Sequence, residues 1–191
     1  MSVRLFDTAR RKVVPFEPGP LVRMYVCGIT PYDSTHLGHA ATYLAYDLLI
    51  RRLEDLGHEA YAEPRATESI PGIVEMVSAL LDSGHAYLTH GTVYFDVSTF
   101  PRFGELSHYS PDHMVKLARA RGGKPDDPHR RDPLDFILWQ PSLPDEPAWR
   151  APFGVGRPGW HVECSVMSMD ALGPHLDLHG GGTDLIFPHH E

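Results

Sequence analysis

Cysteine is scarce in this chain, with two residues among 191, and this excludes a disulfide framework as the basis of its stability. The sequence has no run of about 18 apolar residues, so a membrane-spanning helix is not expected. Residues 1–19 lack the apolar core of a signal peptide. These absences predict a protein of the reducing cytoplasm that does not associate with a membrane.

Positive charge is also in short supply. Seventeen Lys and Arg residues stand against 25 Asp and Glu residues, which gives a formal net charge of −8. Nucleic-acid surfaces need clustered Lys and Arg, so a general nucleic-acid-binding surface is not expected. By contrast, 42% of the residues are hydrophobic, which is enough for a packed core in one domain with or without an insertion. The 13 histidines direct attention to metal ligands.

Hydrophobic periodicity predicts amphipathic helices at residues 40–56 and 70–82, where apolar side chains recur at i, i+3 and i+4. Gly57 and Gly84 follow them, as glycines commonly follow helix ends. The first face comprises Ala41, Leu44, Ala45, Leu48, Leu49, Leu53 and Leu56, and the second comprises Ile70, Ile73, Val74, Val77, Leu80 and Leu81.

Shorter segments complete the expected pattern. Residues 141–158 are proline-rich and are expected to be irregular. Strands alternating with helices predict an α/β fold with parallel strands. The other expected elements are strands at 21–28, 86–89, 92–97, 136–139 and 176–179, and helices at 112–121 and 161–172.

A candidate anion site lies between the first strand and the first helix. Cys27 and Gly28 end the strand, and His36 and His39 flank Gly38 near the start of the helix. A helix N-terminus directs free N–H groups at an anion, and a glycine lets the backbone approach it closely. The two histidines would add hydrogen-bond donors at the same point.

A second constellation has the chemistry of a metal site. Cys27, Cys164 and the pair His189–His190 all stand at predicted element ends, and the carboxyl ends of parallel strands converge on one crevice. Two thiolates and one imidazole would give Zn²⁺ three ligands and leave a fourth position open for a substrate thiolate. The alternative is two buried free cysteines and a hydrogen-bonded histidine.

Three motifs together carry a family resemblance: His36–His39, Gly156–Ser165 and His179–Glu191. They resemble cysteinyl-tRNA synthetases, which are class I aminoacyl-tRNA synthetases. They equally resemble the paralogous ligases that join cysteine to glucosaminyl-inositol in mycothiol biosynthesis. The resemblance implies a Rossmann-like parallel sheet in a single catalytic domain over residues 1–191, with a small α+β insertion at about 85–133. It also implies one zinc ion per chain held by Cys27, Cys164 and His189.

Three local features favour the mycothiol-type ligases over the tRNA synthetases. The first loop reads Gly-Ile-Thr-Pro-Tyr-Asp-Ser-Thr-His over residues 28–36, where tRNA synthetases usually have a Gly-Pro-Thr-Val-Tyr-Asp form. Ala41 stands where the synthetases typically have Arg. Residues 120–125 resemble a Glu-Arg-Gly-Gly-Asp-Pro signature of the ligases, although Ala120 and Lys124 depart from it.

The resemblance also assigns substrates and roles. It implies a monomer that uses ATP with Mg²⁺ to activate cysteine as cysteinyl-adenylate, then transfers the cysteinyl group to glucosaminyl-inositol. His36 and His39 would donate hydrogen bonds to the ATP phosphates as charge develops. Trp160 would close over the adenylate, with core packing as its alternative role. The other residues expected to bind substrate or adenylate are Cys27, Gly28, Ile29, Thr30, Thr42, Gly182, Thr183 and Asp184.

Two departures from the family pattern predict an incomplete catalytic domain. Residues 59–65 run directly into the second helix, so a strand, a helix and a substrate-contacting motif are expected to be missing. The sequence also ends at Glu191, before the family's Lys-Met-Ser-Lys-Ser loop and helical C-terminal domain. The alternatives to the ligase are therefore a cysteinyl-tRNA synthetase and a catalytically impaired remnant that binds zinc or cysteine.

Overall fold

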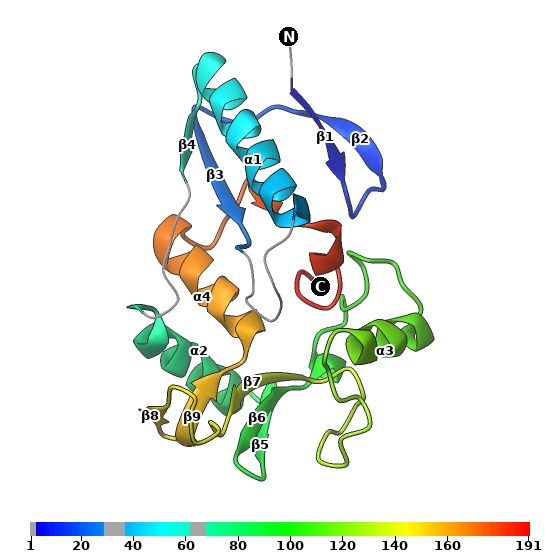
Figure 1. Ribbon diagram of the computed structural model, residues 1–191, viewed down its shortest axis with the longest axis vertical. Coiled ribbons are helices and arrows are strands. Elements are labelled where there is room, and N and C mark those ends of the chain that lie inside the picture. Colours follow the sequence, from blue (N-terminus) through cyan, green and yellow to red (C-terminus); the bar gives the residue numbers. More distant parts are fainter. Residues whose placement is uncertain (1–2, 29–36, 62–67) are drawn as a thin grey trace. The chain divides into compact units, whose positions relative to one another are not determined.

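The computed structural model describes residues 3–28, 37–61 and 68–191. The chain forms two compact units, which are coloured along the sequence in Figure 1. Unit 1 comprises Met1–Pro64 and Ser168–Ile186, and unit 2 comprises Arg65–Met167 and Phe187–Glu191. No helix among the described residues is long and apolar enough to cross a membrane.

Unit 1 contains the parallel sheet of the predicted α/β fold. Strand β3 (Leu21–Val26) lies between β10 (Leu178–Gly180) and β4 (Glu59–Tyr61), and both neighbours run parallel to it. An antiparallel ribbon of β1 (Val3–Asp7) and β2 (Lys12–Phe16) precedes the sheet. Strand β4 corrects the expectation that a strand is missing here, because Glu59–Tyr61 pairs with Leu21–Arg23.

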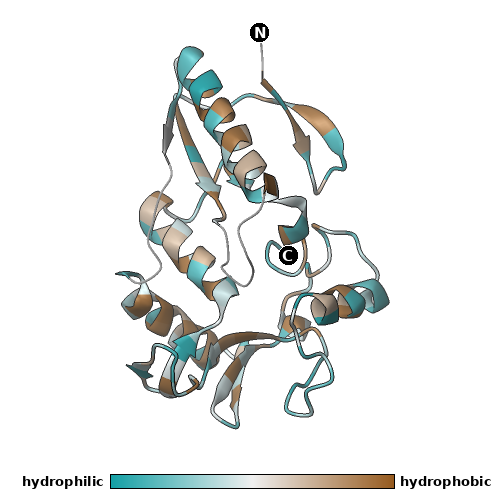
Figure 2. Ribbon diagram, in the orientation of Figure 1, coloured by the Kyte–Doolittle hydropathy of each residue, from teal (hydrophilic) through white to brown (hydrophobic). Residues whose placement is uncertain are grey.

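Helix α1 (Leu37–Asp55) packs on this sheet through Leu53, which is fully buried with Val22 and Met24 of β3. The helix is rotated from the face that its sequence predicts. Leu44 and Leu48 are 63% and 65% exposed, whereas Tyr46, Leu49 and Ile50 pack against the buried cluster. Hydrophobic residues recur along α1 (Figure 2). The predicted face is therefore right at Leu49 and Leu53, which pack in the core, and wrong at Leu44 and Leu48, which are exposed.

Unit 2 is built on an antiparallel sheet in the order β5-β6-β7-β9-β8. The expected hairpin forms between β5 (Ala86–Thr89) and β6 (Thr92–Phe95). Its turn residues His90 and Gly91 both have positive φ, as a two-residue hairpin turn of this hand requires. The strands β7 (Phe136–Gln140), β8 (Trp149–Ala151) and β9 (Gly154–Pro158) complete the sheet.

The irregular structure expected over residues 141–158 is therefore wrong in its second half. Prolines stay outside the paired interior of β8 and β9, since Pro152 lies in the turn between them and Pro158 ends β9. Strand β7 also belongs to this antiparallel sheet, not to the parallel one.

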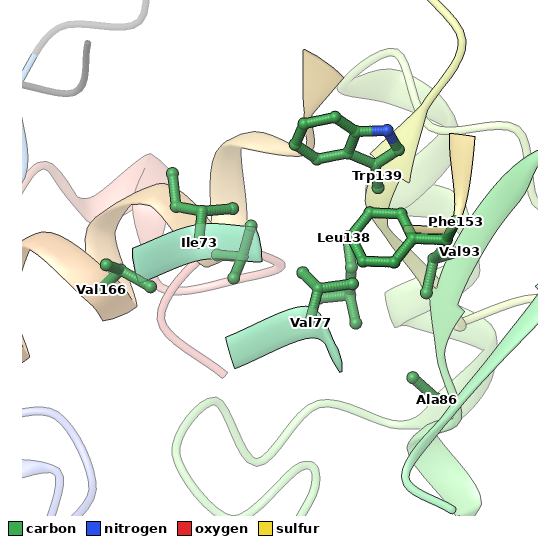
Figure 3. Close-up of a cluster of buried hydrophobic side chains, with 9 residues drawn as sticks. Ile73, Val77, Ala86, Val93, Leu138, Trp139, Phe153 and Val166 are labelled. Carbon is green, nitrogen blue, oxygen red and sulfur yellow. The ribbon is translucent and has the colours of Figure 1, made fainter. Parts of the chain in front are cut away.

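The core of unit 2 lies between this sheet, α2 (Ile70–Asp82) and the start of α4 (Trp160–Leu172), a helix that begins in unit 2 and ends in unit 1. Figure 3 shows the buried side chains of this core pointing towards one another.

The remaining elements of the described residues are α3 (Pro111–Ala120) and the short 3-10 helices η2 (Val97–Thr99) in unit 2 and η3 (Thr183–Leu185) in unit 1. The predicted insertion at about 85–133 falls within unit 2. The buried residues that form the core of unit 2 are Ile73, Val77, Ala86, Val93, Leu138, Trp139, Phe153, Val162 and Val166.

Candidate functional site

The carboxyl ends of β3 and β10 bring a cysteine and a histidine together in unit 1. Cys27 follows β3, and its N–H donates to the carbonyl of Gly180 at 3.0 Å. The Cys27 side chain is 5% exposed, and its Sγ lies 3.3 Å from Nε2 of His179. The His179 ring also makes an edge contact with Tyr25. The parallel sheet thus holds a thiol beside an imidazole at the edge where ligands bind in open α/β folds.

Of the residues predicted to bind phosphate, the structure describes those that belong to α1. His39 lies in the first turn of α1, and Thr42 follows one turn later. The Thr42 hydroxyl donates to the carbonyl of Gly38 at 3.1 Å, so in this state it is bonded within the helix. His36, Ile29 and Thr30 lie outside the described residues.

The predicted adenine and ribose residues follow β10 in the same unit. Gly182 precedes η3, and its carbonyl accepts a hydrogen bond from the N–H of Leu185 at 2.9 Å. Thr183 and Asp184 are exposed. This glycine-rich segment and the start of α1 both belong to unit 1, although about 140 residues of sequence separate them.

Unit 2 brings together the other two predicted zinc ligands. The Sγ atom of Cys164 in α4 lies 3.2 Å from Nε2 of His189. Trp160 stacks on the His189 ring, with centroids 4.0 Å apart and planes within 5°. On the far side of the imidazole, Nδ1 of His189 lies 3.0 Å from Nδ1 of His161. Stacking and hydrogen bonding therefore fix the ring that faces the thiol.

Burial shifts the pKa values of two titratable groups beside this pair towards their neutral forms. Burial lowers the pKa of His161 to about 3, with smaller contributions from His189 and His190. His161 is therefore neutral at physiological pH. Burial also raises the pKa of Glu163, and the neighbouring Cys164 raises it further. A neutral His161 ring adds no positive charge beside a cation that His189 would bind.

The donor atoms of unit 2 fit a Zn²⁺ site in kind and spacing. Tetrahedral zinc with ordinary Zn–S and Zn–N bonds separates the two donors by roughly 3.6 Å, close to the 3.2 Å between Cys164 and His189. The third predicted ligand, Cys27, belongs to unit 1, where it contacts His179. The three-residue ligand set stays a prediction.

Four residues that contact predicted site residues or hold their segment in place were not assigned a role from the sequence: Tyr46, His161, His179 and Glu191. His161 and His179 lie inside the quoted motifs, and Tyr46 follows His39 by seven residues, which places both on one side of α1. The Glu191 carboxylate accepts three backbone hydrogen bonds, from the N–H groups of Gly104, Leu106 and Ser107, at 2.8–3.0 Å. It holds the segment that carries His189 to the rest of unit 2.

Comparison with known proteins identifies the family. Residues 13–61 and 57–191 match the family model for the tRNA synthetases class I (C) catalytic domain. The chain is 42% identical to an L-cysteine:1D-myo-inositol 2-amino-2-deoxy-alpha-D-glucopyranoside ligase of Streptosporangium roseum, over 99% of this chain and 58% of the relative. Proteins with the same name from Nocardia farcinica and Mycolicibacterium smegmatis are 42% and 44% identical, over 99% and 100% of this chain and 58% of each relative.

The alignment also locates a difference from these relatives. It extends over 236 positions with the Streptosporangium protein, whereas this chain has 191 residues, so at least 45 positions of the relative have no counterpart here. The two segments of the family match meet at residues 57–61, which places the break beside β4. The chain spans somewhat more than half the length of the curated relatives it matches. With its parallel sheet and both matched segments, this chain belongs to the class I (C) tRNA synthetase catalytic domain family.

Proposed function

We propose that this chain supplies the catalytic domain of a ligase that joins cysteine to the amine of glucosaminyl-inositol with ATP. The observation that carries the proposal is the 42–44% identity, over nearly the whole chain, to several proteins that bear this ligase name. The first-loop sequence over residues 28–36 and Ala41 support the same choice.

The reaction would proceed in two steps. A carboxylate oxygen of cysteine attacks the α-phosphorus of ATP, forming cysteinyl-adenylate while pyrophosphate leaves. The amine nitrogen of glucosaminyl-inositol then attacks the cysteinyl carbonyl, forming an amide while AMP leaves and the amine loses a proton. His39, with His36, would donate hydrogen bonds to the phosphate oxygens as charge develops at the α-phosphorus, an effect worth about 3–4 kcal/mol for one such donor.

The predicted metal fits this chemistry. Bound by Cys164, His189 and Cys27, Zn²⁺ would supply a soft Lewis acid that prefers a thiolate to a hydroxyl. Cysteine and serine differ by one atom, and an apolar pocket discriminates poorly between near-isosteres. A thiolate-selective centre would therefore explain selection of cysteine without a separate editing site. The chain's own part is to hold His189 with Nε2 toward Cys164, through Trp160 and His161.

Product analysis tests the acceptor. The protein is incubated with cysteine and ATP, together with either glucosaminyl-inositol or tRNA, and products are identified by mass spectrometry. We expect the cysteinyl amide of glucosaminyl-inositol and no cysteinyl-tRNA. Cysteinyl-tRNA as the product would favour the runner-up, a cysteinyl-tRNA synthetase.

A third candidate is a catalytically impaired domain that binds zinc or cysteine. The observation that favours it is the absence of at least 45 positions that the relatives carry. Cysteine-dependent exchange of labelled pyrophosphate into ATP distinguishes it from both enzymes, because exchange requires adenylate formation. A protein that binds cysteine but shows no exchange would be such a remnant.

A further inference from the structure

The hydroxyl of Tyr46 makes two hydrogen bonds to one glycine in unit 1. It accepts from the N–H of Gly181 at 2.7 Å and donates to the carbonyl of Gly181 at 3.3 Å. In a sheet, the N–H and carbonyl of Gly181 would bond to a neighbouring strand, but β10 ends one residue earlier, at Gly180. The side chain of α1 therefore takes over where strand pairing stops.

Close packing adds to these hydrogen bonds. A Cβ atom on Gly180 would overlap the Tyr46 ring, so the absence of a side chain lets the ring lie against the backbone. The same ring packs against the buried cluster of Val22, Met24 and Leu53. Tyr46 is thus anchored at its ring by the core and holds the glycine segment at its hydroxyl.

The position of Tyr46 on α1 gives this contact a functional meaning. His39, Thr42 and Tyr46 are spaced at i, i+3 and i+7 and lie on one side of the helix. Gly181 directly precedes Gly182, Thr183 and Asp184. Tyr46 therefore connects the helix that carries the proposed phosphate donor to the segment proposed to hold adenine and ribose.

We infer that Tyr46 is a positioning residue for ATP, which fixes the two halves of the nucleotide site relative to each other. This inference rests on the proposed function. Its hydroxyl does not contact the nucleotide in this role. It keeps the segment at Gly181 in the conformation that binds ATP, so the protein does not have to order this segment on binding.

The test is the Tyr46→Phe substitution, which keeps the ring and removes both hydrogen bonds. Amide hydrogen exchange of the ligand-free protein reports on Gly181 directly, and calorimetric titration with ATP without cysteine reports on binding. Because two hydrogen bonds are lost, we expect amide exchange at Gly181 to be at least about tenfold faster. We expect the dissociation constant for ATP to be about five- to tenfold higher. Tyr94→Phe is the matched control, because it removes one hydroxyl hydrogen bond, to Asp127 at 3.0 Å, within unit 2. It should change neither quantity.

The outcomes separate the two proposals. Unchanged exchange at Gly181 in the Tyr46→Phe protein would overturn the anchoring role. Faster exchange with unchanged ATP affinity would overturn the role in nucleotide positioning, while ATP use would stand. Failure of the wild-type protein to bind ATP would refute the proposed function and the nucleotide role together, and exchange at Gly181 would still report whether Tyr46 anchors the segment.

Discussion

The two cysteines of this chain each lie beside a histidine, in different units. Cys27 is almost fully buried next to His179, and Cys164 is half-buried next to His189. Buried cysteines that act only as small apolar side chains need no such partner. The pairing with imidazole nitrogen supports metal binding as their role, and zinc content can test it residue by residue.

Replacing Cys164 with serine should remove most of the zinc affinity. A serine hydroxyl does not ionise to act as a ligand as a thiol does, so we expect at least about 100-fold weaker binding. Competition with a chromophoric chelator measures the affinity, and elemental analysis should give about one zinc per wild-type chain. Ser165→Ala, which removes a hydroxyl from an exposed neighbour, should retain wild-type affinity. Equal zinc affinity in Cys164→Ser and wild type would contradict this ligand assignment.

Tyr87 should make the stability of the protein sensitive to alkaline pH. Its hydroxyl donates to the fully buried Asp135 at 2.6 Å, and burial followed by this hydrogen bond raises the pKa of Tyr87 well above its usual value near 10. Above pH 10 the unfolded state loses the tyrosine proton and the folded state keeps it, so the free energy of unfolding falls as pH rises. The slope attributable to this residue is at most about 1.4 kcal/mol per pH unit.

Urea denaturation of wild type and Tyr87→Phe measures this effect. At pH 7 the substitution should cost about 1–2 kcal/mol, because Asp135 loses a donor. The stability difference should shrink between pH 10 and pH 11 as the wild type loses its advantage. A difference that stays constant to pH 11 would show that Tyr87 ionises equally in both states.

At the scale of elements, helix α1 offers a comparison between identical residues. Leu53 is fully buried against β3, whereas Leu48 is 65% exposed on the same helix. Leu53→Ala should lower the free energy of unfolding by about 2–5 kcal/mol, because it leaves a cavity in the core. Leu48→Ala should change it by less than about 0.5 kcal/mol. Thermal or urea unfolding gives both values, and similar losses at both positions would mean that Leu48 is covered in solution.

The elements also differ in how well periodicity located them. Helices α2 and α4 agree with their predicted ranges within a residue, and on α2 the apolar side predicted by periodicity packs against the core of unit 2. On α1, leucines occur on more than one side, and only packing on β3 selects Tyr46, Leu49, Ile50 and Leu53. Strands β8 and β9 were not predicted because their segment is rich in proline. Pro152 lies in the turn and Pro158 ends β9, and both positions are compatible with strand pairing.

At the scale of the whole molecule, the charge of −8 predicts weak binding to tRNA. Few phosphate contacts release few counterions, so the 191-residue chain should bind tRNA with a dissociation constant weaker than about 10⁻⁴ M at physiological salt. Fluorescence anisotropy with labelled tRNA, repeated at several salt concentrations, measures the affinity and its salt dependence. Micromolar binding with a steep salt dependence would favour the tRNA synthetase alternative.

The division into two compact units was not evident in the sequence, and the single catalytic domain over residues 1–191 stays a prediction. Each unit has its own buried cluster, around Leu53 in unit 1 and around Trp139 in unit 2. Segments far apart in the sequence complete each unit, as β10 does beside β3 and Phe187–Glu191 does beside the loop at Gly104–Ser107. Long-range pairing of this kind leaves no local periodic signal.

The sequence by itself determined the fold class, the family and most helices, because these depend on local patterns and contiguous motifs. It also selected Cys164 and His189, which the tertiary structure brings within hydrogen-bonding distance. Only the tertiary structure decided which side of α1 is buried and that the strand before the second helix persists as β4. It alone showed that Tyr46 contacts Gly181, that His161 contacts His189, and that His179 contacts Cys27. The physical reason is that these facts depend on contacts between segments tens to more than a hundred residues apart, which no window of sequence contains.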